Sequence, residues 1–130
     1  MKPRRILVVD DEPGIRQSLG GVLEDEGYSV ASVESGEACL ETLAGGEFEV
    51  ALLDIWLPGM DGLEVLRSCK EDRALRDIPS IMSSGETLRT KIKEVEEAGA
   101  EAYIMKPFSF DALQDTIERI WSNHTVSHCL

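Results

Sequence analysis

The sequence of 130 residues has few cations and no long apolar run. Lysine and arginine together number 13 against 25 aspartate and glutamate, which gives a formal net charge of −12. A protein of this charge repels phosphate backbones and anionic headgroups, so we expect no direct binding of nucleic acid or of a membrane. The acidic balance suits a divalent cation or a basic partner surface instead.

Cysteine is also scarce, and its three positions lie far apart without a C-x-x-C pair (Cys39, Cys69 and Cys129). An odd number of separated cysteines argues against a disulfide framework or a zinc site and for free thiols in a reducing compartment. The first apolar run, Ile6–Val9, is too short for a signal peptide or a membrane span. We therefore expect a cytoplasmic protein.

Short apolar runs alternate with amphipathic stretches along the chain. There are five such runs, namely Ile6–Val9, Ser29–Val33, Val50–Ile55, Ile81–Met82 and Ala102–Met105. Nearly unbroken runs, as in the first and third, are typical of strands covered on both faces. The stretches between them have apolar residues at helical spacing. The pattern predicts a single doubly wound α/β domain, with a five-stranded parallel sheet and helices on both faces.

Residues with reactive or charged side chains stand at the carboxyl ends of the predicted strands. In chain order they are Asp10, Asp11, Asp54, Ser83, Ser84 and Lys106. In α/β sheets of this kind, ligands bind beyond the carboxyl ends of the strands, where the strand order reverses. We therefore expect three carboxylates, a hydroxyl and an ammonium group to converge on one edge of the sheet.

Such a cluster has an electrostatic requirement. Three close carboxylates repel one another, and without help at least one pKa would rise. A Mg²⁺ ion and Lys106 would offset three negative charges, and Mg²⁺ prefers oxygen ligands. Asp54 would then stay ionised and nucleophilic, and a phosphoryl group arriving on it would be held by the metal, by Lys106 and by a hydroxyl donor. Positioning and charge neutralisation are most of what phosphoryl transfer requires.

Five motifs between Arg5 and about Trp121 resemble the receiver domain of two-component response regulators. They are Ile6-Leu7-Val8-Val9-Asp10-Asp11-Glu12, Leu53-Asp54, Leu57-Pro58-Gly59-Met60-Asp61-Gly62, Ser84-Gly85 and Lys106-Pro107-Phe108. Asp54 precedes Ser84 by 30 residues and Lys106 by 52, as is usual in that family. The resemblance implies a flavodoxin-like (βα)5 receiver domain over 1–121, followed by a polar tail over 122–130 without an effector domain. The run Ile55-Trp56-Leu57-Pro58 resembles nitrogen-regulation-type regulators.

The resemblance implies a role for each residue of the cluster. Asp54 is the phosphoacceptor, which takes a phosphoryl group from the phosphohistidine of a sensor histidine kinase or phosphotransfer protein. Asp11 is a direct Mg²⁺ ligand, Asp10 acts through water, and the backbone carbonyl of Trp56 supplies a further ligand. Lys106 grips a phosphoryl oxygen.

The resemblance also implies a conformational switch. Ser84 is the hydroxyl that moves toward the phosphoryl group, and Tyr103 is the aromatic residue whose ring turns inward. Pro107 follows a cis peptide bond, which shapes the loop of Lys106. Ser83 is adjacent to Ser84, and the spacing of 30 residues alone selects between them; Tyr103 equally fits ordinary packing in a half-buried strand.

The sequence therefore predicts a signalling switch rather than an enzyme. Phosphorylation of Asp54 would shift a two-state equilibrium. The resemblance implies that the shift acts through the fourth helix, fifth strand and fifth helix. This face would control a partner, a second copy of the chain or an attached output domain. We expect self-phosphorylation from a phosphodonor and slow dephosphorylation as the sole reactions. A stand-alone receiver and a piece of a longer regulator both fit the sequence.

Three alternative functions are weighed against the same sequence. A phosphohydrolase of the haloacid dehalogenase type needs an acid two residues after the nucleophile, where this chain has Trp56. An FMN-binding protein needs a Ser/Thr/Gly-rich phosphate loop after the first strand, which is absent here. A receiver domain that can no longer be phosphorylated is the third alternative. The acidic residues argue against it, because all of them are present. The bulk of Trp56 beside Asp54 is the feature that would favour it.

Overall fold

Strands and helices alternate along the chain. The computed structural model describes residues 4–57, 59–85 and 89–129, with only the backbone described at 89, 90 and 122–129. Pro58 of the third motif lies outside the described residues. The strands are β1 (Arg5–Val9), β2 (Ser29–Val33), β3 (Val50–Asp54), β4 (Ser80–Ser84) and β5 (Ala102–Met105). The helices are α1 (Pro13–Asp25), α2 (Gly36–Gly45), α3 (Gly62–Glu71), α4 (Arg89–Glu97) and α5 (Phe110–Cys129).

The strands form one five-stranded sheet in the order β2-β1-β3-β4-β5, and every pairing is parallel. The chain moves from β1 outward to β2 and then returns to the other side of β1, so the order reverses between β1 and β3. Val9 pairs with Leu53, and Asp54 pairs with Ser83. The predicted fold class is confirmed, and the switch point lies beside Asp10, Asp11 and Asp54.

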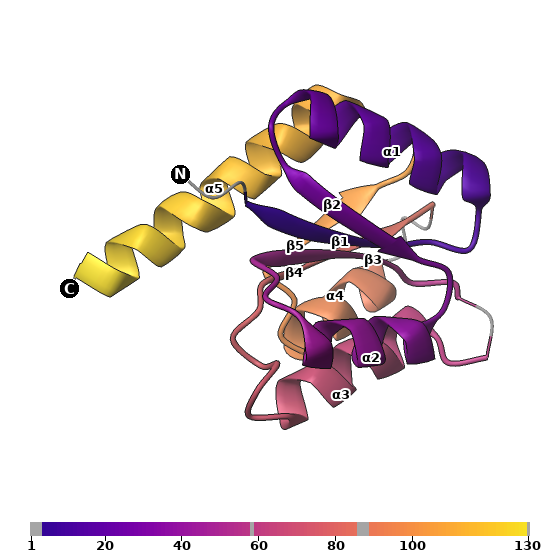
Figure 1. Cartoon of the computed structure of the whole chain (residues 1–130). Helices are drawn as coiled ribbons and strands as arrows, with labels where there is room; N and C mark the ends of the chain where they lie inside the picture. Colours follow the sequence, from indigo (N-terminus) through magenta and orange to yellow (C-terminus); the bar gives the residue numbers. More distant parts are fainter. Residues whose placement is uncertain (1–3, 58, 86–88, 130) are drawn as a thin grey trace.

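Two layers of helices cover the sheet. Helices α1 and α5 lie on one face, and α2, α3 and α4 lie on the other (Figure 1). Ile6 and Val8 of β1 belong to the core under α1 and α5, whereas Leu7 and Val9 belong to the core under α2–α4. Successive residues of a strand point to opposite faces, and both faces of β1 are covered, which agrees with its unbroken apolar run from Ile6 to Val9.

Local sequence explains where several helices begin and end. The Ser35 and Asp61 side chains accept hydrogen bonds from the backbone N–H groups of Ala38 and Glu64, at 3.2 and 3.0 Å, and cap α2 and α3. Gly27 and Gly99 follow α1 and α4 with φ values of 98° and 103°, which glycine adopts without strain. Within the described residues, no helix is both long and apolar enough to cross a bilayer.

Helix α5 continues past residue 121, where the sequence predicts a change from the receiver domain to a polar tail. It runs to Cys129, and its last turns project beyond the sheet (Figure 1). Trp121 anchors the helix to the body, because its ring stacks on Tyr28 with 6.0 Å between centroids and lies 4.0 Å from the Arg4 guanidinium. Residues 122–129 contain no glycine or proline to stop a helix. The domain boundary at 121 stays a prediction.

Candidate functional site

Three carboxylates meet at the carboxyl edge of the sheet, as predicted. Asp10 and Asp11 follow β1, Asp54 is the last residue of β3, and one oxygen from each lies within 4.8 Å of the other two. Asp10 and Asp54 are buried, at 3% and 6% exposure, while Asp11 is exposed. Because its donors are carboxylate oxygens, this cluster fits a hard divalent cation such as Mg²⁺, and the exposed Asp11 leaves one side open to solvent.

Lys106 closes the cluster from the loop between β5 and α5. Its Nζ donates hydrogen bonds to Asp10 Oδ2 at 2.7 Å and to Asp54 Oδ2 at 3.1 Å. The peptide bond between Lys106 and Pro107 is cis, as the resemblance implied. The Lys106 backbone N–H donates to the Ser84 carbonyl at 2.8 Å, so the end of β4 helps to hold the lysine in place.

Burial and charge act in opposite directions at this site. Burial and, to a lesser extent, the charge of Asp10 raise the pKa of the Asp54 carboxyl, and together they outweigh the lowering by the charge and hydrogen bond of Lys106. Burial lowers the pKa of Lys106, but the hydrogen bonds and charges of Asp10 and Asp54 together outweigh it and raise that pKa. The ion pair therefore keeps Lys106 protonated without fully compensating the desolvation of Asp54, and an added cation would lower the pKa of Asp54.

Trp56 lies between the cluster and α4. Its backbone N–H donates to Asp54 Oδ1 at 3.2 Å, which orients the carboxylate. The residue is 52% exposed, and its ring centroid is 5.1 Å from Lys91 Nζ on α4. The indole therefore contacts α4 at the outer side of the loop that follows β3.

The two adjacent serines of β4 are both buried, and they point to opposite faces of the sheet. The Ser83 hydroxyl donates to the Leu53 carbonyl at 3.5 Å, a long hydrogen bond. Ser84, the predicted switch residue, is the last residue of β4 and pairs with Met105 of β5. Tyr103 is half-buried and packs against the core under α2–α4. Ser84 therefore stands at the same edge as the carboxylates, and Tyr103 lies on the neighbouring strand.

Sequence reasoning missed Arg16. This residue lies on α1, and its Nη1 donates to the backbone carbonyl of Asp10 at 2.6 Å. The acceptor is a main-chain oxygen, which every residue has. No pattern of side chains could therefore have marked the contact.

The chain matches the response regulator receiver domain model over residues 6–118. It is 34% identical over 118 residues to the chemotaxis protein CheY of Pseudomonas aeruginosa, which covers 90% of this chain and 95% of that protein. It is 38% identical over 117 residues to the nitrogen assimilation regulatory protein NtrX of Azorhizobium caulinodans, covering 88% of this chain and 25% of that protein. The relatives thus include a nitrogen-regulation protein.

Solved structures agree with these sequence matches. The CheY-like receiver domain protein of Methanospirillum hungatei superposes with a TM-score of 0.90 at 33% identity, covering 96% of this chain and 98% of that one. A receiver domain of a sensor histidine kinase from Pseudomonas aeruginosa, with a magnesium ion coordinated in its active-site cleft, gives a TM-score of 0.83 at 26% identity, covering 90% and 96%. The fold, the acidic edge of the sheet and these matches show that the chain belongs to the response regulator receiver domains, which are signalling domains of two-component systems.

Proposed function

We propose that this chain is a phosphorylation-controlled switch and that Asp54 is its phosphoacceptor. The observation that carries this proposal is the placement of a buried carboxylate at the end of β3, 3.1 Å from Lys106 Nζ and in one cluster with two further carboxylates. A desolvated carboxylate beside a fixed cation is suited to nucleophilic attack on a group that brings negative charge. Membership of the receiver family supports a phosphohistidine of a sensor histidine kinase or phosphotransfer protein as the donor.

The proposed reaction is a direct transfer. An oxygen of Asp54 forms a bond to phosphorus while the bond from phosphorus to the donor imidazole nitrogen breaks, and the electron pair leaves with that nitrogen. The Lys106 ammonium already contacts Asp54 and is within reach to pair with a phosphoryl oxygen. The Ser84 hydroxyl, from the neighbouring strand, donates a hydrogen bond to a second phosphoryl oxygen. Both contacts offset the charge that arrives with the phosphoryl group.

The proposed cation site consists of Asp10, Asp11, Asp54 and the backbone carbonyl of Trp56. Asp11 is the direct ligand and Asp10 acts through water, in keeping with their exposed and buried positions. Bound Mg²⁺ would supply positive charge to the phosphoryl oxygens. The magnesium ion in the active-site cleft of a related receiver domain supports this assignment.

The proposed readout is the surface formed by α4, β5 and α5. Ser84 and Tyr103 lie on the neighbouring strands β4 and β5, so a shift of Ser84 toward a phosphoryl group is next to the strand that carries Tyr103. The Tyr103 ring turns inward in response, and the surface then favours one of its two conformations. Through it the protein controls a partner, a second copy of itself or an attached output domain. The net charge of −12 favours a basic protein surface over nucleic acid.

Phosphorylation with a small donor tests the acceptor. Incubation with acetyl phosphate and Mg²⁺ should add one phosphoryl group, measured by intact-protein mass spectrometry, and Asp54→Asn should prevent it. Asp115→Asn, an exposed carboxylate on α5 with the same change of charge, should be labelled like the wild type. Equal labelling of Asp54→Asn would overturn the proposal.

Sedimentation with and without beryllium fluoride and Mg²⁺ tests whether the protein dimerises as its readout.

A further inference from the structure

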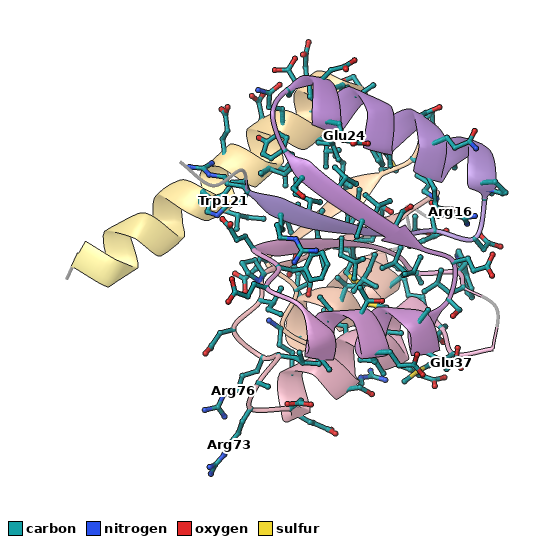
Figure 2. The ribbon with its side chains drawn as sticks, viewed as in Figure 1. Arg16, Glu24, Glu37, Arg73, Arg76 and Trp121 are labelled. Atoms are coloured by element: carbon teal, nitrogen blue, oxygen red, sulfur yellow. The ribbon has the colours of Figure 1, made fainter. Side chains whose placement is uncertain are left out.

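Arg16 joins α1 to the turn that carries two of the three carboxylates. Its side chain is largely buried, at 18% exposure, although it bears a charge. Nη1 donates to the Asp10 carbonyl at 2.6 Å, and Nη2 lies 3.9 Å from Glu34 Oε2 beyond the end of β2. Figure 2 shows Arg16 and Trp121 at opposite ends of the sheet. Arg16 lies at the end where the strands finish.

The contact completes the fixation of Asp10. The Asp10 N–H donates to the Val33 carbonyl at 3.2 Å, its Oδ1 accepts from the Glu12 N–H at 3.0 Å, and its Oδ2 accepts from Lys106 Nζ at 2.7 Å. Arg16 holds the one remaining polar group, the carbonyl oxygen. Asp10 therefore has separate hydrogen bonds to β2, to its own turn, to α1 and to the loop after β5.

The carbonyl of Asp10 belongs to the same planar peptide unit as the N–H of Asp11. Fixing the carbonyl therefore fixes the direction in which the chain enters Asp11. Asp11 is the exposed member of the carboxylate cluster, and a rotation of this peptide unit would change where its side chain lies relative to Asp54. The hydrogen bond has a charged donor, and such bonds are about twice as strong as neutral ones.

The second contact of Arg16 is the weaker one. Glu34 is 75% exposed and its oxygen lies at the long distance of 3.9 Å, so solvent screens the pair. The guanidinium touches a main-chain oxygen and not a carboxylate of the cluster, so its effect on the cluster is alignment more than neutralisation.

We propose that Arg16 is a positioning residue of the cation site, which holds the Asp10–Asp11 peptide so that the Asp11 carboxylate stays beside Asp54. This inference rests on the cation site of the proposed function. Supporting residues behind metal ligands commonly change metal affinity by about tenfold or more when they are removed.

Calorimetric titration with MgCl₂ at constant ionic strength tests the inference without measuring phosphorylation. Arg16→Ala should raise the Kd for Mg²⁺ about tenfold. Arg16→Lys should fall between this variant and the wild type, because an ammonium group cannot reproduce both contacts of the guanidinium. Glu34→Gln removes the weak ion pair and should leave the Kd close to that of the wild type. Arg67→Ala, an exposed arginine on α3, controls for the change of net charge.

Two further measurements separate alignment from general damage to the fold. Far-ultraviolet circular dichroism and thermal unfolding without Mg²⁺ establish that each variant is folded at the titration temperature. At saturating Mg²⁺, Arg16→Ala should be phosphorylated by acetyl phosphate at about the wild-type rate, since a pure loss of affinity is restored by concentration.

An unchanged Kd in folded Arg16→Ala would overturn the inference, and so would an equal loss in Arg67→Ala. If Arg16→Ala does not fold, the Kd of Arg16→Lys decides: a raised Kd supports the inference, and an unchanged Kd overturns it. Failure of the wild-type protein itself to bind Mg²⁺ would instead overturn the cation site of the proposed function, so the two failures are distinguishable.

Discussion

At Asp54, burial favours the neutral carboxyl, whereas the proposed attack on phosphorus needs the ionised form. Burial raises its pKa above the ordinary value of 3.8. The folded protein therefore binds a proton at this carboxyl more tightly than the unfolded chain does, and ionising it costs stability. The protonated carboxyl favours the folded state. This contribution to the free energy of unfolding is fully present below pH 3.8 and is lost as the pH rises through the raised pKa.

Asp54→Asn should therefore stabilise the protein in the absence of Mg²⁺ at pH 7, by about 1 kcal/mol, an ordinary size for a single substitution. Lys106 keeps its shorter hydrogen bond to Asp10, at 2.7 Å, so the substitution does not strand the ammonium group. The gain should shrink as the pH falls toward the ordinary pKa of Asp54, where the wild-type carboxyl takes up its proton. Urea unfolding in EDTA measures both effects.

Asp115→Asn is the control for this measurement, because that carboxylate is exposed on α5. Its free energy of unfolding should stay near that of the wild type across the same pH range. A destabilised Asp54→Asn, or a gain that does not depend on pH, would contradict the assignment of a raised pKa to burial.

At the scale of secondary-structure elements, the start of α3 presses against the end of β3. The Gly62 N–H donates to the Ile55 carbonyl at 2.7 Å. A Cβ atom at position 62 would lie 2.8 Å from the Ile55 Cα and even closer to the Asp54 carbonyl oxygen. These neighbours are backbone atoms of the segment that carries the site, so they cannot move aside without moving Asp54.

Gly62→Ala should therefore destabilise the protein by about 3 kcal/mol, the upper end of the usual cost of overpacking. Gly21→Ala on α1 is the matched control, since nothing lies within 4 Å of its added methyl group. That substitution should stabilise the helix by about 1 kcal/mol. Urea unfolding of the two variants checks the opposite signs, and a Gly62→Ala protein as stable as the wild type would show that the contact between α3 and β3 yields easily.

The elements also show where prediction from sequence succeeds. Strands β1 and β3 leave the most direct pattern, because their apolar runs are nearly unbroken and are buried on both faces. The edge shared by the carboxyl ends of all five strands follows from their parallel pairing. The course of α5 beyond residue 121 was not predicted, because Ser122–Leu130 has no apolar stripe that demands burial. The contact of Trp56 with Lys91 was missed for a related reason, since an exposed contact between loop and helix imposes no periodicity.

The free thiols predicted from the number of cysteines are confirmed for Cys39 and Cys69, which lie on α2 and α3 and are buried in the core. Burial raises the pKa of the Cys39 thiol to about 12, so it is unreactive in the folded protein. The Cys129 side chain lies outside the described residues.

At the scale of the whole molecule, the acidic charge opposes folding, and a bound cation would reduce this cost. The net charge is −12, and three carboxylates are gathered at one edge of the sheet. A ligand that binds the folded state alone adds stability in proportion to the logarithm of its concentration.

Mg²⁺ should therefore raise the free energy of unfolding by about 2.7 kcal/mol at a concentration one hundred times its Kd. Thermal unfolding followed by circular dichroism measures the shift, with NaCl at matched ionic strength as the control for general screening. Asp11→Ala should abolish the part of the shift that exceeds the effect of NaCl. An equal shift with NaCl would indicate screening of the acidic surface without a specific site.

The two tryptophans lie at opposite ends of the sheet, with Trp121 stacked on Tyr28 near the start of β2 and Trp56 directly after β3. Replacing Trp121 by phenylalanine would leave an aromatic ring for Tyr28 to stack on and a single indole, two residues from the carboxylate of Asp54. Fluorescence excited selectively in that indole would then report the occupancy of the acidic edge in real time. The chain therefore contains its own optical probe, and no dye has to be attached beside the site.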